Sequence, residues 1–272
     1  MRALELLGTN APGAVPALAA ALRDSSPMVS GAAANALPRF GRAAVPALAA
    51  ALRDPDPTVL NLASMALRNI GPEAAPAIPA LMRVLTNGPF LTPSFASSAL
   101  GRIGPPAIEP LLSALTHTNR ETRMFAAGAV SSIGWPATNA IPALARLAND
   151  PEPSVRAAAV EALGNIRPGW PQAAAAFADA LKDQNDNVRI RALQALLRSP
   201  RGVRLVLPAL TDMLRDPNAQ IRAGAARDLA LGGAAAVSAV PALEIAATDS
   251  NSAVAMSARQ ALEVIRQSAG PK

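Results

Sequence analysis

The sequence predicts an all-α solenoid, a stack of short helical hairpins, on three observations. A "VPAL"-like segment recurs every 30 or 33 residues along nearly the whole chain. The apolar residues are mainly Ala, Leu, Val and Ile, with five Phe, two Trp and no Tyr. Small side chains suit closely packed helices, whereas a compact core of this size normally uses more aromatic volume. No composition shift or Gly/Ser linker divides the 272 residues into two cores.

The repeats share an anchor, the position of the proline in "VPAL". The anchors are Pro16, Pro46, Pro79, Glu109, Pro142, Ala175, Pro208 and Pro241. We therefore expect a single domain over residues 1–272, with eight hairpins at about 9–41, 42–71, 72–104, 105–134, 135–167, 168–200, 201–233 and 234–267. Residues 1–8 match the end of a second helix and predict a partial repeat. Because this end lacks a polar cap, we expect the chain to be the C-terminal part of a longer array or multidomain protein.

Each hairpin has a helix A and a helix B. In helix A, leucines two and six positions after the anchor, such as Leu18 and Leu22, form an apolar stripe. Helix A ends at an aspartate eight positions after the anchor: Asp24, Asp54, Asp150, Asp183, Asp216 and Asp249. Helix B begins two positions later at an N-cap residue: Ser26, Asp56, Asn119, Asn185, Asn218 and Asn251. Glycines predict a left-handed C-cap for helix B: Gly41, Gly71, Gly104, Gly134 and Gly233.

An arginine stands fourteen positions after the anchor in four repeats. In three of them it follows the aspartate by six residues, giving the pairs Asp150 and Arg156, Asp183 and Arg189, and Asp216 and Arg222. These pairs are candidates for an ion or phosphate site, or for a structural ladder between turns. We favour the ladder, because a pair that recurs with the frame belongs to the repeat and not to one site.

The composition narrows the available chemistry. The chain has no cysteine and a single histidine, His117, which takes the place of the aspartate in the fourth repeat. We therefore predict no catalytic residue, no metal and no cofactor. The uncharged stretch 124–145 is interrupted by two glycines and two prolines, so we expect no membrane span, and no signal peptide is recognisable. Cytoplasmic localisation is the default that remains.

Residues 141–166, "IPALARLANDPEPSVRAAAVEALGNI", resemble the HEAT-like repeats first recognised in phycobilisome lyases. The resemblance implies the fold, while such repeats occur in scaffolds, adaptors, bilin lyases and a few enzymes. HEAT-like di-iron hydroxylases need several His-Glu pairs, which one histidine excludes. HEAT-like DNA glycosylases use aromatic, Asp and Arg side chains on the concave face, but both Trp residues here fall between repeats.

B helices usually line the concave face of such arrays. Twenty-three positions after the anchor, this face is predicted to carry Arg39, Asn69, Arg102, Asn165 and Arg198, with Arg68 beside them, and then Leu231 and Val264. Nineteen positions after the anchor it adds Asn35, Met65, Ser98, Glu161, Gln194, Arg227 and Gln260. This polar, mildly basic stripe suits an acidic or extended peptide; the alternative is an ordinary solvated helix surface.

Two further features depart from the frame. Trp135 and Trp170 occupy successive inter-repeat segments and are candidate partner anchors, or else pack over their own hairpins. The third repeat replaces the polar turn by residues 87–95, which marks either a contact site or a bend.

The function we predict is a non-enzymatic, monomeric scaffold or adaptor that binds a protein or extended peptide. The alternatives are a bilin-lyase-like or chaperone-like factor for a chromophore protein and, second, a nucleic-acid-binding protein. The sequence argues against nucleic acid, because there is no dense Lys/Arg patch with interleaved aromatic residues.

Overall fold

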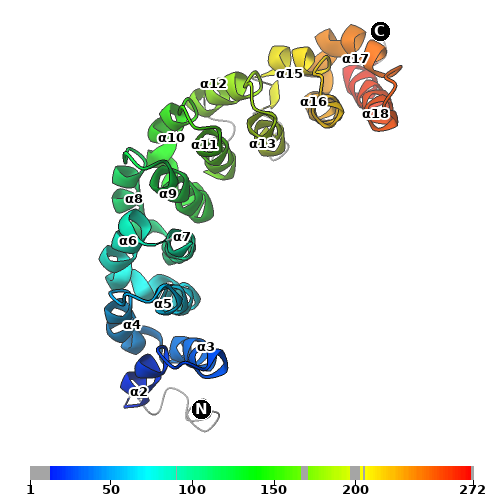
Figure 1. The fold of residues 1–272 in the computed structure, drawn as a ribbon. Coiled ribbons are helices and arrows are strands. Elements are labelled where there is room, and N and C mark those ends of the chain that lie inside the picture. The colour runs from blue at the N-terminus through cyan, green and yellow to red at the C-terminus, as the bar shows by residue number, and fades with distance from the viewer. Residues whose placement is uncertain (1–12, 90, 167–170, 197–202, 205, 271–272) are drawn as a thin grey trace. The chain divides into compact units, whose positions relative to one another are not determined.

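The computed structural model describes residues 13–89, 91–166, 171–196, 203–204 and 206–270, and it confirms the predicted all-α solenoid. Helical hairpins follow one another along the chain, each with a helix A and a helix B (Figure 1). No strand occurs in these described ranges. The chain forms two compact units, residues 1–137 and residues 138–272, which we call unit 1 and unit 2. The predicted partial repeat at residues 1–8 lies outside the described residues.

The described residues of unit 1 form four hairpins. Their A and B helices are α2 (Ala14–Ala21) and α3 (Pro27–Ala36), α4 (Val45–Ala51) and α5 (Pro57–Ile70), α6 (Ile78–Asn87) and α7 (Thr92–Ile103), and α8 (Ile108–Ala114) and α9 (Arg120–Ile133). The 3-10 segments between hairpins are η2 (Leu37–Ala44), η3 (Gly71–Ala77) and η4 (Pro105–Ala107). Each A helix packs on its own B helix, and the B helices pack on one another in chain order.

Unit 2 repeats this arrangement, and η5 (Trp135–Ala140) precedes its first helix. Its A and B helices are α10 (Ile141–Leu147) and α11 (Pro153–Ile166), α12 (Pro171–Ala180) and α13 (Asp186–Leu196), α15 (Leu207–Met213) and α16 (Ala219–Gly232), and α17 (Val240–Ala246) and α18 (Ser252–Ala269). The segment η6 (Gly233–Ala239) joins α16 to α17. The B helices α11, α13, α16 and α18 again pack in series.

Two hydrogen bonds close four of the A–B turns, those that begin at Asp54, Asp183, Asp216 and Asp249. The aspartate that ends helix A accepts a backbone N–H two residues later, as Asp216 does from Asn218 at 2.8 Å. That second residue then caps helix B, as Asn218 does by accepting from the backbone N–H of Gln220 at 2.9 Å. His117 makes the hydrogen bond that the aspartate makes in other repeats, because its Nδ1 accepts the backbone N–H of Asn119 at 3.1 Å. Ser26, in contrast, precedes α3 without a side-chain cap bond.

Glycines end the B helices, but in a different conformation from the one predicted. Gly71, Gly104 and Gly134 have φ of 74°, 90° and 71° with ψ of −136°, −144° and −140°. A left-handed helical residue has ψ near +47°, so the prediction of that conformation was wrong, although φ is positive. Glycine enters this region because it has no Cβ. Gly41 lies inside η2, since α3 ends at Ala36, two residues before a proline.

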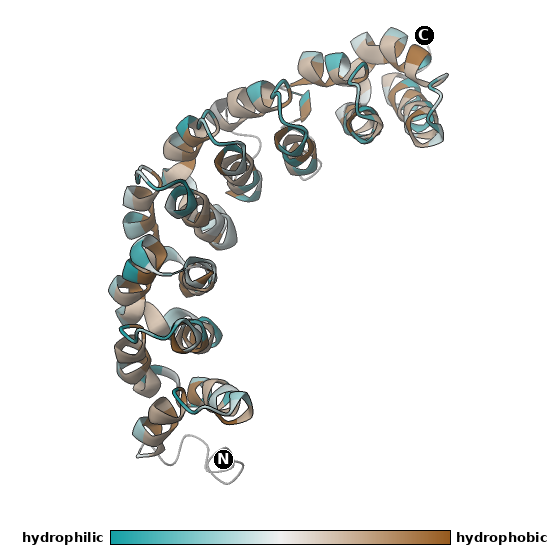
Figure 2. Cartoon of the chain, in the orientation of Figure 1, coloured by the Kyte–Doolittle hydropathy of each residue, from teal (hydrophilic) through white to brown (hydrophobic). Residues whose placement is uncertain are grey.

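The core consists of leucine and alanine side chains between the A and B helices. Leu18 and Leu144 on A helices and Leu67 and Leu163 on B helices are fully buried. The A–B turns are hydrophilic, whereas the helices carry both hydrophobic and hydrophilic residues (Figure 2). Alanine and leucine are sufficient here because each hairpin contributes only a thin layer that its neighbours cover.

One stretch among the described residues, 219–246, is long and apolar enough to cross a membrane by length and composition alone. In the structure it is not one helix. It consists of α16, η6 and α17, and the chain bends at Gly233, where φ is 54°. Both α16 and α17 pack on other helices of unit 2, so the segment is built into the hairpin stack.

Candidate interaction face on the B helices

The predicted Asp and Arg residues of unit 2 join neighbouring hairpins. Arg156 donates from Nε to Asp183 Oδ2 at 2.6 Å and from Nη2 to Asp183 Oδ1 at 2.8 Å. Its Nη1 donates to the backbone carbonyls of Asp150 and Pro151, at 2.8 and 3.0 Å. Each arginine thus binds the carbonyls of its own turn and the carboxylate of the next repeat. We call these residues, with Asp249, the turn ladder.

The other two arginines of the turn ladder make equivalent contacts. Arg222 donates to both carboxylate oxygens of Asp249, at 2.7 and 2.9 Å, and to the carbonyl of Asp216 at 2.9 Å. Arg189 donates to the carbonyl of Asp183 at 2.7 Å and pairs with Asp216, with 2.9 Å between Nε and Oδ2. These guanidinium groups are therefore engaged in holding turns together.

The ion pairs of the turn ladder shift pKa values in the expected direction. Burial disfavours the charged form of Asp183, but hydrogen bonds from Arg156 and from the backbone of Asn185 outweigh it and hold the pKa of this carboxyl below its ordinary value. The hydrogen bond to Asp183 in turn raises the pKa of Arg156. Both partners are therefore charged at neutral pH.

The stripe residues named at twenty-three positions after the anchor, and Arg68, are exposed where the structure describes them, whereas Met65, Ser98 and Glu161, at nineteen positions, are half-buried. Arg68 and Asn69 lie near the end of α5, and Arg102 lies near the end of α7, which packs on α5. Asn165 is exposed on α11 in unit 2, and Arg198 lies outside the described residues. Arg39 was expected on a B helix, but it lies in the 3-10 segment η2, because Pro38 cannot donate the helical hydrogen bond.

Trp135 is mostly exposed. It follows Gly134, which ends α9, and 65% of its surface is accessible. The indole is large and amphipathic, and tryptophan is enriched at protein interfaces. Trp170 lies outside the described residues, so the structure does not place the two indoles relative to each other.

The unusual turn of the third repeat contains a strained, exposed leucine. Leu91 has φ of 67° and ψ of −23°, and it is 57% exposed directly before α7. Among the described residues it is the only non-glycine with positive φ. The hydroxyl of Thr92 donates to the carbonyl of Pro89 at 2.6 Å and fixes this turn. The turn is thus a local change of backbone path, with an apolar side chain at its tip.

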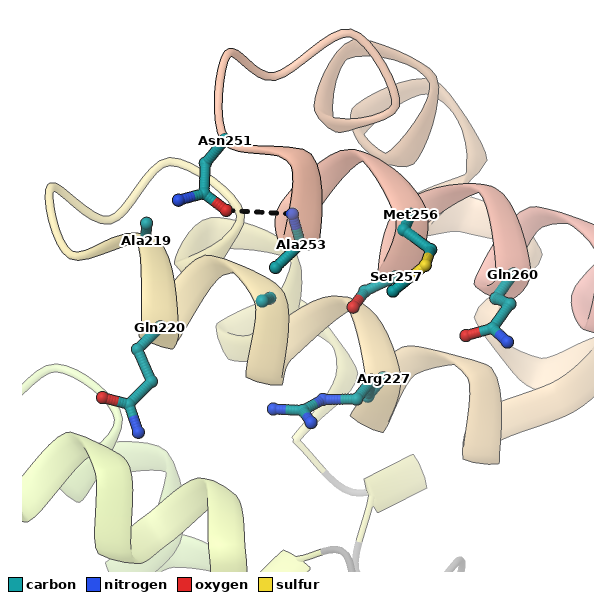
Figure 3. A pocket seen from close by; sticks show the side chains of 9 residues that line it. Ala219, Gln220, Arg227, Asn251, Ala253, Met256, Ser257 and Gln260 are labelled. Carbon is teal, nitrogen blue, oxygen red and sulfur yellow. Dashed lines mark hydrogen bonds between the residues drawn. The ribbon is translucent and has the colours of Figure 1, made fainter.

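A groove runs along the exposed surface of the B helices α16 and α18, which pack side by side (Figure 3). We call it the B-face groove. It has a volume of about 520 Å³ and is lined by Ala219, Gln220, Ala223, Arg227, Asn251, Ala253, Met256, Ser257 and Gln260. Gln220, Ala223 and Arg227 on α16, and Ala253, Met256 and Gln260 on α18, are spaced by three or four positions, so on each helix these residues share one face. Because the alanine side chains are short, they leave the groove open between the longer polar side chains.

Arg227 is the cation of the B-face groove. It is exposed, and its guanidinium forms no ion pair or hydrogen bond within the described part of the chain. The contrast is Arg191 on α13, which pairs with Glu161 on α11 at 3.2 Å. Asn251 is partly occupied, because its Oδ1 accepts the N–H of Ala253 at 3.0 Å as the cap of α18. Met256 is 63% exposed and adds an apolar contact.

Asp228, next to Arg227 in the chain, is fully buried. Neither carboxylate oxygen has a hydrogen-bond partner among the described residues. Burial raises the pKa of Asp228 to about 8, against a smaller lowering by Arg227, so the carboxyl is mostly protonated at pH 7. The seven equivalent positions in the other repeats are all alanine: Ala36, Ala66, Ala99, Ala129, Ala162, Ala195 and Ala261.

Two lining residues of the B-face groove, Arg227 and Gln260, belong to the predicted stripe, nineteen positions after the anchor. The other stripe positions of these two repeats, Leu231 and Val264, do not line the groove. Which polar position borders a groove depends on the gap between two helices, and the periodicity of one helix does not determine that gap.

Comparison with known proteins places the chain among repeat proteins. The family model for HEAT repeats matches residues 1–68, 15–92 and 129–197, which together make up more than half of the chain. No curated protein matches the sequence.

Solved structures similar to the chain are helical solenoids of low sequence identity. An engineered protein is 24% identical, with a TM-score of 0.55 over 97% of this chain and 80% of that chain. The Escherichia coli protein YibA is 19% identical, with a TM-score of 0.59 over 91% of this chain and 92% of that chain. A mutant of Kap121p is 15% identical, with a TM-score of 0.62 over 99% of this chain, which spans only 39% of Kap121p. At identities this low, the structural similarity shows a shared fold and nothing more.

Proposed function

Because the chain belongs to the HEAT-repeat family, we propose that it is a non-enzymatic protein-interaction scaffold that holds a protein or an extended peptide on the exposed face of its B helices. The B-face groove carries the proposal. Gln220, Arg227 and Gln260 are exposed there, and their side chains make no hydrogen bond among the described residues. These polar side chains are therefore available to bind a partner that lies in the groove.

A similar solenoid supports this use of the fold. Kap121p has been solved bound to Nup53p, and that structure is 14% identical to this chain with a TM-score of 0.61. The match covers 98% of this chain and 39% of Kap121p. A stack of hairpins presents a long row of equivalent positions, so an extended partner can contact several repeats at once.

Trp135 is the proposed contact in unit 1. Its exposed indole offers a large contact area at little cost in conformational entropy, and tryptophan is enriched at the energetic centres of interfaces. We propose that it contributes a second anchor for the same partner or for another one.

A protein partner fits the charges better than a nucleic acid does. The arginines of the turn ladder are bound to aspartates, and Arg191 is paired with Glu161. Binding to a phosphate backbone depends on several unpaired cations that release counterions together. The B-face groove offers one such cation, Arg227.

Site-specific photo-crosslinking tests the scaffold proposal. A benzophenone amino acid at Gln194, exposed on the B helix α13, is expected to capture a partner in cells of the source organism. The same group at Asp179, exposed on the A helix α12, is the matched control and is expected to capture little. Equal capture from both positions, or capture only from Asp179, would contradict a role for the B face.

A further inference from the structure

We infer that the B-face groove binds an extended peptide segment through one Asp or Glu side chain, which pairs with Arg227, and a neighbouring apolar side chain, which contacts Met256. This inference rests on the proposed function and specifies the chemistry of the partner.

The charge of the groove selects a carboxylate. None of its nine lining residues is acidic, and Arg227 is its only charged side chain. The guanidinium has no ion pair among the described residues, so its donors are available. A guanidinium fork matches a carboxylate with two parallel hydrogen bonds. Asp228 does not cancel this charge, because it is fully buried and is mostly protonated at neutral pH.

The remaining polar groups suit a peptide backbone. Gln220 and Gln260 each present an amide with two donors and one acceptor oxygen, and Figure 3 places them along the same groove as Arg227. Extended peptides expose alternating N–H and C=O groups that such amides can satisfy. One arginine among several amides is therefore better suited to a peptide with a single acid than to a polyanion.

The polar lining of the groove favours an extended chain over a helix, because an extended backbone leaves its N–H and C=O groups available to Gln220 and Gln260, whereas a helix pairs most of its own. Seven residues separate Gln220 from Arg227 on α16, which corresponds to roughly 10 Å along the axis. An extended peptide advances ~3.3 Å per residue, so this length accommodates about three residues.

Met256 supplies the apolar half of the site. It is 63% exposed on α18, and the alanines at positions 219, 223 and 253 also line the groove. Methionine adapts its three rotatable bonds to different apolar partners. The groove therefore accepts a leucine-like side chain next to the acid without requiring one particular shape.

A peptide array tests the inference. The probes are capped alanine heptapeptides that contain one Glu and one Leu at every pair of positions, with a matched set that has Gln in place of Glu. The wild-type chain is expected to bind the best Glu peptides about five- to tenfold more tightly than their Gln counterparts, measured as Kd by fluorescence anisotropy at low salt. Arg227→Gln should abolish this preference.

Two control variants keep the result specific. Arg146→Gln removes the same charge from an exposed position on α10, outside the groove, and should keep the preference for Glu. Met256→Ser should weaken the binding of the Leu-containing peptides to the same extent whether they carry Glu or Gln. Circular dichroism checks that all variants are folded.

The outcomes separate this inference from the scaffold proposal. Equal binding of Glu and Gln peptides, a preference that survives Arg227→Gln, or no binding of any peptide would overturn the inference. If crosslinking at Gln194 still captured a partner, the scaffold role would stand with another partner chemistry. If Gln194 captured nothing, the scaffold role would fail as well.

Discussion

Arg156 binds both carboxylate oxygens of Asp183, which lies in the turn of the following hairpin, through Nε at 2.6 Å and Nη2 at 2.8 Å. The third nitrogen, Nη1, donates to two carbonyls in the turn of its own hairpin. The side chains are only 15% and 10% exposed, so water competes little for these bonds. One guanidinium therefore connects two successive turns of unit 2.

Removing this guanidinium should destabilise the chain. Arg156→Ala leaves a shielded carboxylate and two carbonyls without their donor, and we expect a loss of about 1–3 kcal/mol in the free energy of unfolding. Urea unfolding at pH 7 measures it. The control is Arg146→Ala on α10, which is exposed and should change stability by less than about 0.5 kcal/mol. Equal unfolding midpoints for the two variants would contradict the role of the pair.

The pH dependence of the same pair follows from the lowered pKa of Asp183. A carboxyl whose pKa is depressed by folding contributes stability above its unfolded pKa, and that stability is lost as the pH falls through its folded pKa. The stability difference between wild type and Asp183→Asn should therefore be full at pH 6–7 and should shrink as the pH falls below about 4. Urea midpoints of both proteins across this range measure the difference, and a constant difference would argue against the ion pair.

Asp228 should lower stability at neutral pH. Its pKa is raised to about 8 by burial, so unfolding releases a proton at every pH between the unfolded and folded values. The sign is opposite to that of Asp183: stability is full below about pH 4 and falls as the pH rises toward 8. Asp228→Ala, which introduces the residue of the other seven repeats, should stabilise the chain by roughly 4 kcal/mol at pH 7.

The pH series distinguishes this effect from simple repacking. The advantage of Asp228→Ala over wild type should grow by up to about 1.4 kcal/mol for each pH unit between 4 and 8. Thermal unfolding at four or five pH values is sufficient. A gain that does not vary with pH would mean that the carboxyl is not protonated in the folded chain.

The close approach of α11 and α13 depends on Gly164. A Cβ at this position would lie 2.4 Å from the Cβ of Ala195, so Gly164→Ala forces the two helices apart and should cost about 1–3 kcal/mol. Gly31→Ala is the matched control, because nothing lies within 4 Å of a Cβ there and the residue is inside α3. This control should gain about 0.5–1 kcal/mol from helix propensity. Urea unfolding should therefore show a lower stability for Gly164→Ala and a higher stability for Gly31→Ala than for the wild type. A loss of stability in both variants would contradict this explanation.

Trp135→Ala should separate binding from stability. The indole is largely exposed, so its removal should lower the melting temperature by only a few degrees. If Trp135 anchors a partner, the same change should weaken capture of that partner by at least about tenfold, corresponding to a hot-spot residue. Val237→Ala, which shortens an exposed apolar side chain in η6 of unit 2, is the control. Unchanged capture by Trp135→Ala would remove this anchor from the proposal.

The repeating architecture and its turn chemistry could be predicted from local sequence patterns. Helical periodicity is local, so Leu18 and its equivalents predicted the buried face of each helix, and Asn218 and its equivalents predicted where helix B begins. The glycines predicted positive φ but not the value of ψ, because ψ depends on how the next segment leaves the helix.

Which side chains are engaged and which remain available depends on contacts between repeats, and local patterns do not predict those contacts. Arg156, Arg191 and Arg227 are the same residue type on successive B helices, yet within the described ranges the first two are paired and the third is not. Likewise, Asp183 and Asp228 have opposite pKa shifts because one carboxylate has an arginine partner and the other is buried without one. These differences depend on distances between neighbouring repeats, which are set by packing across the stack and not by the pattern within one helix.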